Sequence, residues 1–198
     1  SVEATPEQLD VLGNLPFVQG LRVVKRAPLD VRPQGNSAWT AEQEDFGRAW
    51  DQLQHVGVPA VHDCGLTGQG VVIGVQDTGF RLVHPALEQT LVLGAYDFLD
   101  DNAVVANEES DHPDQDAHGT MVLSLITGWD PGRYRGVAPS AAVLLTKTED
   151  VRVEEPFEED RYVAGLEWIE AQGADIFTAS LNYFEWYEMD DLDGQTAV

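Results

Sequence analysis

Cysteine, basic residues and long hydrophobic runs are all scarce in this chain. The single cysteine, Cys64, cannot form a disulfide within the chain, and no cysteine-based metal site can form. No run approaches the roughly 18 consecutive apolar residues of a membrane-spanning helix, and no signal peptide is visible. The sequence therefore predicts neither a disulfide scaffold nor a membrane-spanning protein.

The charge is strongly one-sided. Eleven Lys and Arg residues stand against 35 Asp and Glu residues, which leaves a formal net charge of −24. Nucleic acids and anionic membranes would repel this chain, so both are excluded as partners. The charge suits a secreted, periplasmic or salt-adapted protein, or one that collects divalent cations. The simpler interpretation, a solvated acidic face that maintains solubility, explains the charge better.

Strands and helices are expected to alternate after about residue 40. The 198 residues, of which 43% are hydrophobic, suffice for the core of one domain or slightly more. The alternation predicts an α/β fold with a doubly wound, mostly parallel sheet and right-handed crossovers. Expected strands lie at 71–77, 91–98, 141–146 and 174–181, and expected helices at 40–53, 58–65, 119–126 and 158–172.

The first 36 residues form a separate unit in the sequence. Thr5, Pro6 and Gln8 match a capped helix start, and that helix should end near Gly13. A strand is expected at 15–24, and residues 28–36, with two prolines and a glycine, are typical of a linker. One helix and one strand cannot bury a core alone, so this segment needs a packing partner or a missing beginning.

Two polar residues follow elements that position them well for chemistry. Asp77 closes the buried strand at residues 71–77, and His118 opens the helix that begins near Gly119. The ends of parallel strands are where α/β proteins place their sites. A histidine base needs a carboxylate that fixes its tautomer and stabilises the imidazolium, and Asp77 is the natural candidate.

The tripeptide at residues 77–79 has a second reading. Aspartic proteases also use Asp-Thr-Gly, with two carboxylates that share one proton. This chain has a single copy and would have to form a homodimer, and the parallel α/β pattern fits that class poorly. A pair formed by Asp77 and His118 explains the pattern better.

Several motifs, taken together, resemble the subtilisin-like serine peptidases, or subtilases. They stand in the family's order and near its spacing across residues 58–184: Val-Ile-Gly-Val-Gln-Asp77-Thr-Gly-Phe, His84-Pro85, Asp116-Ala-His118-Gly-Thr-Met-Val, Gly136-Val-Ala-Pro139 and Ala174-Asp-Ile-Phe-Thr-Ala-Ser180-Leu181. Residues 148–151 and 158–160 resemble a branch of secreted bacterial subtilases.

The resemblance implies roles for particular residues. Asp77 orients the base, His118 acts as general base and then general acid, and a serine is the nucleophile. Ser180, Leu181 and Asn182 match the strand that binds the substrate as an added β-strand, although the family usually has glycine where Asn182 stands. None of the six serines lies in the family's Gly-Thr-Ser-Met-Ala setting, and the oxyanion-hole asparagine is also absent.

The resemblance also implies a domain organisation. Residues 1–30 match the end of an inhibitory propeptide, and residues 31–198 match the N-terminal half of a catalytic domain, so the subtilisin-type sheet is expected to be incomplete. The expected partners are a protein or peptide substrate and the C-terminal half that carries the serine, on the same precursor or on a second chain. Alone, these 198 residues are expected to be inactive.

Cofactors and location complete the expectations. The chemistry is expected to require no cofactor, and no metal-ligating residue is assigned. The sequence leaves open whether a structural calcium ion binds. His112, among Asp111, Asp114 and Asp116, either binds a cation or lies in a wet acidic loop. A secreted or periplasmic location is expected. The alternative function is a non-catalytic, subtilase-like acidic module for binding or assembly.

Overall fold

The computed structural model describes residues 46–188 as one run, together with Thr5, Leu9, Val11, Asn14, Asp191 and Gly194. The chain divides into two compact units, Ser1–Gly35 and Asn36–Val198. In the first unit Leu9 and Val11 are helical, as the sequence predicts. The expected strand at 15–24, the linker at 28–36 and the rest of the proposed propeptide segment 1–30 lie outside the described residues.

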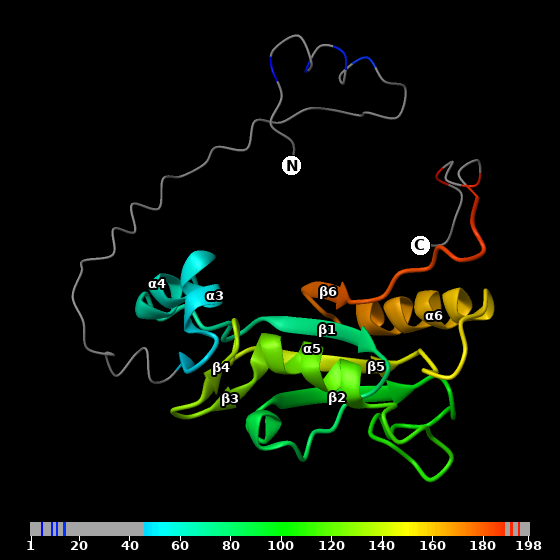
Figure 1. Ribbon diagram of the computed structural model, residues 1–198, viewed down its shortest axis with the longest axis horizontal. Helices are drawn as coiled ribbons and strands as arrows, with labels where there is room; N and C mark the ends of the chain where they lie inside the picture. Colours follow the sequence, from blue (N-terminus) through cyan, green and yellow to red (C-terminus); the bar gives the residue numbers. More distant parts are fainter. Residues whose placement is uncertain are drawn as a thin grey trace. The chain divides into compact units, whose positions relative to one another are not determined.

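A parallel sheet organises the second unit (Figure 1). Its strand order is β2-β5-β1-β6, and every neighbouring pair is parallel. The bounds of the four strands are β1 Val72–Asp77, β2 Leu91–Asp97, β5 Ala142–Lys147 and β6 Ile176–Ala179. The predicted mostly parallel α/β fold is confirmed.

The two central strands are buried because their sequences are almost free of charge until their last residues. From the second residue onward β1 and β5 are buried, and Val75, Val143 and Leu145 are completely inaccessible. Burial of each such side chain stabilises the fold by roughly 1.5–3 kcal/mol. Strands of this kind require cover on both faces of the sheet.

One helix covers each face. Helix α5, Ala117–Thr127, contributes Val122 and Leu123 to the same core cluster as Ile73 and Val75 of β1. Helix α6, Phe157–Ala171, packs on the other face of β1, where Gly74 lies against Ile169. Successive strand residues point to opposite faces, so these contacts place α5 and α6 on opposite sides of the sheet. This arrangement is the predicted doubly wound one.

The contact between β1 and α6 depends on a glycine. A Cβ atom on Gly74 would lie 2.1 Å from Cγ2 of Ile169, a side chain that is only 1% exposed. We expect Gly74→Ala to lower the free energy of unfolding by about 1–3 kcal/mol, because the helix must shift to relieve the overlap. Gly94→Ala in β2 is the matched control, since its Cβ would meet Leu144 and Trp168 at 3.3 Å. Urea titration measures both, and equal losses would contradict the packing argument.

The helix expected at 40–53 is not continuous. Gly47 has a positive φ of 51° and forms an isolated bridge with Tyr134, and α3 begins only at Trp50 (Trp50–His55). A Cβ on residue 47 would lie 1.9 Å from the carbonyl oxygen of Arg133, so only glycine allows this approach. The prediction of one helix is therefore wrong at Gly47.

The helix predicted near 58–65 is confirmed as α4, Val58–Asp63. A short 3₁₀ helix, η1, spans Pro85–Leu87. An antiparallel hairpin that the sequence analysis did not predict joins β3, Trp129–Asp130, to β4, Tyr134–Arg135. Among the described residues, no helix is long and apolar enough to cross a membrane.

Candidate active site

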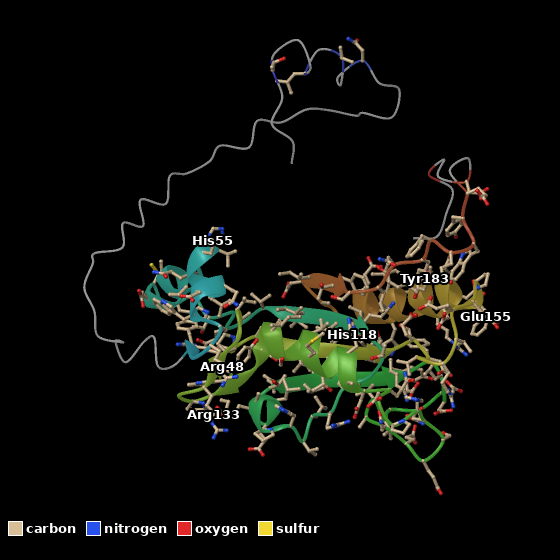
Figure 2. All side chains as sticks on the ribbon, in the orientation of Figure 1. Arg48, His55, His118, Arg133, Glu155 and Tyr183 are labelled. Carbon is tan, nitrogen blue, oxygen red and sulfur yellow. The ribbon has the colours of Figure 1, made fainter. Side chains whose placement is uncertain are left out.

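The two residues singled out from the sequence are in direct contact. Asp77 is the last residue of β1, His118 is the second residue of α5, and His118 Nδ1 lies 2.7 Å from Asp77 Oδ1 across 41 residues of chain. A carboxylate can only accept, so Nδ1 donates and the proton-accepting lone pair lies on Nε2. Asp77 is fully buried, whereas the His118 side chain is 42% exposed. Figure 2 labels His118 on α5. The pair thus has a buried anion and an accessible base.

Local bonds orient the carboxylate. The Thr78 backbone N–H donates to Asp77 Oδ1 at 2.7 Å, and the Thr78 hydroxyl donates to the same oxygen at 3.2 Å. A Cβ on Gly119 would lie 2.2 Å from the Gly79 carbonyl oxygen and 2.9 Å from Asp77 Cβ. The glycine after His118 is therefore what allows the first turn of α5 to approach the end of β1.

An ion pair holds the start of α5. Arg81 Nη2 lies 2.6 Å from Asp116 Oδ1, and the Arg81 backbone N–H donates to the Thr120 hydroxyl at 2.7 Å. The guanidinium pairing raises the pKa of Arg81. These contacts connect the loop after β1 to both sides of His118, so the histidine is positioned by two elements.

A pocket of about 360 Å³ opens beside His118. It also contains the three residues expected to bind substrate, Ser180, Leu181 and Asn182. They were expected within a strand, but β6 ends at Ala179 and they follow it without regular structure. The remaining lining residues are Thr78, Glu149, Asp150, Val151, Val153, Glu154 and Glu158.

Glu149 is a buried carboxylate in this pocket that the sequence analysis did not assign to the site. It is 7% exposed, and its Oε1 accepts hydrogen bonds from the Tyr183 hydroxyl and, at 3.1 Å, from the Thr148 hydroxyl. Burial raises the pKa of Glu149 to about 7; the hydrogen bond from Tyr183 opposes this, and the charge of Glu158 adds to it. The only signal was its place just after a buried strand.

A second buried charge lies at the end of β5. Lys147 is completely inaccessible, and its Nζ lies 2.7 Å from Asp97 Oδ2 and 2.8 Å from Asp111 Oδ2. Burial disfavours the ammonium, but hydrogen bonds and charges of the two carboxylates outweigh it and raise the pKa of Lys147. Two of the three aspartates considered with His112 as cation ligands form ion pairs instead. Asp111 pairs with Lys147, and Asp116 pairs with Arg81.

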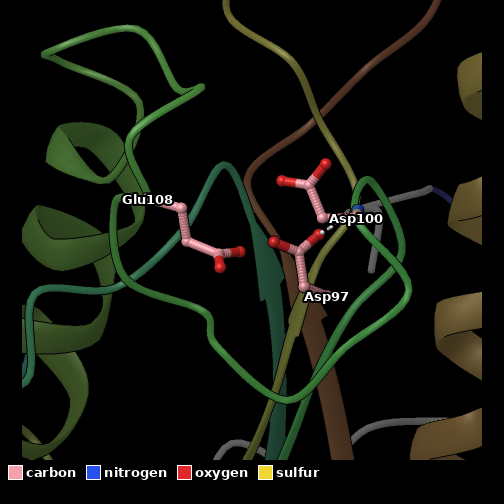
Figure 3. Close-up of side chains that lie close together, drawn as sticks. All are labelled: Asp97, Asp100 and Glu108. Carbon is pink, nitrogen blue, oxygen red and sulfur yellow. Dashed lines mark hydrogen bonds between the residues drawn. The ribbon is translucent and has the colours of Figure 1, made fainter.

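Three carboxylates lie close enough together to be considered as metal ligands. Oxygens of Asp97, Asp100 and Glu108 lie within 4.8 Å of one another (Figure 3). However, the Lys147 ammonium lies 2.7 Å from Asp97, and Glu108 accepts a hydrogen bond from Asn102 at 2.9 Å. The ammonium already pairs with Asp97 and would repel a metal ion bound to that carboxylate, so we assign no metal to the group.

The sheet and the Asp–His pair define the chain as an α/β protein with a site at the carboxyl ends of its strands. The sequence profile described as the Subtilase family matches residues 68–196. The chain therefore belongs to the subtilase family.

Individual relatives agree with this assignment. The chain is 29% identical over 159 residues to the minor extracellular protease Vpr of Bacillus subtilis (strain 168), covering 72% of this chain and 18% of Vpr. It is 29% identical over 130 residues to subtilisin E of the same organism, covering 65% of this chain and 31% of that protein. The chain thus spans less than a third of the length of either relative.

Solved structures of subtilisin-like proteases share the fold. The CspB protease of Clostridium perfringens aligns with a TM-score of 0.52 and 20% identity, over 67% of this chain and 34% of CspB. MycP1, with its N-terminal propeptide removed, aligns with a TM-score of 0.51 and 19% identity, over 71% of this chain and 41% of MycP1. These alignments support the fold assignment.

Proposed function

We propose that this chain supplies the Asp and His of a serine endopeptidase that hydrolyses peptide bonds through an Asp-His-Ser triad. The observation that carries the proposal is the 2.7 Å contact between Asp77 and His118, with the exposed side of the imidazole facing a pocket. Membership of the subtilase family supports it. The partner that brings the serine is the C-terminal half of the catalytic domain, on the same precursor or on a second chain.

Each residue has a defined step in this mechanism. His118 Nε2 takes the proton from the serine hydroxyl as the oxygen attacks the peptide carbonyl, and it then protonates the leaving amine. Asp77 keeps the proton on Nδ1 and stabilises the imidazolium. Ser180, Leu181 and Asn182 offer backbone groups to an extended peptide, and the side chain of Asn182 narrows or polarises the pocket for the residue before the cleaved bond. None of these steps needs a metal ion.

A fluorophosphonate probe tests the proposal, because it reacts covalently with activated serines. We expect the untreated protein preparation to be labelled on one serine outside residues 1–198, as identified by mass spectrometry of the labelled peptide. His118→Ala should remove the label. Absence of labelling on every polypeptide in an intact preparation would instead support the non-catalytic acidic binding or assembly module.

A separate prediction concerns the isolated chain. Purified residues 1–198 should not hydrolyse a peptide ester, because no serine here lies in the family's nucleophile setting. A continuous spectrophotometric assay measures this, and turnover that survives repurification would show that the chain carries its own nucleophile.

We also propose a location and an N-terminal role by resemblance. A secreted or periplasmic location fits the acidic charge, and the relative Vpr is named an extracellular protease. Residues 1–30 would then be the end of a propeptide that keeps the precursor a zymogen. A structural calcium ion would serve stability and not the chemistry.

A further inference from the structure

The pocket beside His118 is lined by carboxylates and contains no Lys or Arg. Glu149, Asp150, Glu154 and Glu158 all contribute to its wall. Two of them are already committed: Asp150 pairs with Arg152 through both oxygens, and Glu158 accepts backbone N–H groups with both oxygens. The other two are the ones available to a ligand.

Glu149 is the deeper of these two carboxylates. Its Oε1 is held by Tyr183 and Thr148, whereas Oε2 has no hydrogen-bond partner among the described residues, although the residue is only 7% exposed. Oε2 is not one of the fully buried side-chain oxygens that lack a partner, so it is accessible to solvent or to a ligand, and Glu149 lines the pocket. Glu154 is exposed and has no described partner, so it adds negative charge at the rim.

We propose that this pocket selects peptides by taking a Lys or Arg side chain near the scissile bond, with Glu149 Oε2 as its acceptor. The inference rests on the proposed peptidase function. The aliphatic stem of the guest lies against Val151 and Val153, and its charged head reaches the carboxylates, as long basic side chains do in amphipathic sites. His118 on the same pocket wall places the guest within a few residues of the cleaved bond.

The electrostatics of the pocket give this preference a pH dependence. Burial raises the pKa of Glu149 to about 7, so its negative charge is present above that pH and is lost as the pH falls. Selectivity for a basic side chain should therefore increase as the pH rises through about 7. The charged and titratable groups that face Glu149 or share its pocket are Tyr162, Tyr183, Glu154, Glu158, Asp150 with Arg152, and His118.

Two peptide series that differ only in one charge provide the test. Fluorogenic peptides carry either Arg or the neutral isostere citrulline at each position around the cleaved bond, and the enzyme is the form that fluorophosphonate labels. We expect kcat/KM to favour Arg over citrulline at one position by about tenfold or more, mainly through KM. The ratio of the two kcat/KM values cancels every pH effect that is common to both substrates.

Two variants test whether Glu149 is the carboxylate that binds the basic side chain. Glu149→Gln should reduce the Arg preference to about twofold or less and remove its pH dependence, while hydrolysis of the citrulline peptide stays measurable. Glu167→Gln makes the same charge change at an exposed position of α6 outside the pocket, and it should leave the ratio unchanged. If Glu149→Gln does not fold, the comparison of Arg and citrulline peptides with the parent enzyme still tests whether the pocket selects a basic side chain.

The outcomes separate the two proposals. Equal cleavage of Arg and citrulline peptides at every position would overturn the basic pocket and leave the peptidase function standing. An Arg preference that Glu149→Gln does not alter would overturn the assignment to Glu149. Failure to label any serine or to cleave any peptide would overturn the peptidase function, and the pocket proposal with it.

Discussion

His118→Ala in the complete enzyme should reduce kcat by about 10⁶-fold, the loss found when the histidine of a serine-protease triad is removed. The imidazole is the only group described beside the pocket that pairs with a buried carboxylate and also offers a free ring nitrogen. Without it, the described residues offer no imidazole paired with Asp77 to accept the serine proton. Asp77→Asn should cost about 10⁴-fold, because the amide presents the wrong hydrogen-bonding pattern to Nδ1.

Matched variants show whether these losses are specific. His55 lies at the exposed end of α3, and His55→Ala should retain the parent kcat. Stopped-flow single-turnover measurements with a saturating peptide ester separate chemistry from binding, and KM should change little in the Asp77 variant. Parent-level kcat in either triad variant would refute the assigned roles.

Lys147→Met should strongly destabilise the fold, although Lys147 lies outside the site. It removes the only ammonium that contacts the buried carboxylates of Asp97 and Asp111 among the described residues. Removing one partner leaves uncompensated buried charge, which costs about 3–5 kcal/mol of unfolding free energy. Methionine keeps the volume of the chain, so the loss reports charge and not a cavity.

The control uses the same chemistry at the surface. Arg133 is 81% exposed and lies 3.8 Å from Asp130, so Arg133→Met should change stability by less than about 1 kcal/mol. Urea denaturation followed by tryptophan fluorescence measures both variants, with the slope m compared to verify that the folded states are equally compact. If the two variants lost the same free energy, the buried network would have no special role.

Features set by local pattern were predictable from the sequence. The uncharged run before Asp77 predicts a buried strand from its own composition, and α5 ends at Thr127, one residue beyond the end expected for the helix at 119–126. The contact between Asp77 and His118 was also predictable, because two recognisable motifs lie at the end of one strand and the start of one helix. Their spacing and residue types carry that information locally.

Features that depend on distant partners were not predictable. Gly47 fits a helix by its sequence context, but its positive φ and its bridge to Tyr134 interrupt the helix. The carbonyl of Arg133 lies where a Cβ atom of residue 47 would be. Glu149 and Lys147 have no periodicity that marks them as buried ionisable groups. Their burial depends on Tyr183, Asp97 and Asp111, which approach only when the sheet has formed.

By itself, the amino-acid sequence determined the α/β class, the alternation of strands and helices, and the identity of the Asp–His pair, because hydrophobic periodicity and short motifs act over a few residues. Only the tertiary structure decided which carboxylates line the pocket, and which two carboxylates contact Lys147. Solvation and Coulomb interactions depend on distances between segments far apart in the chain, and only folding sets those distances.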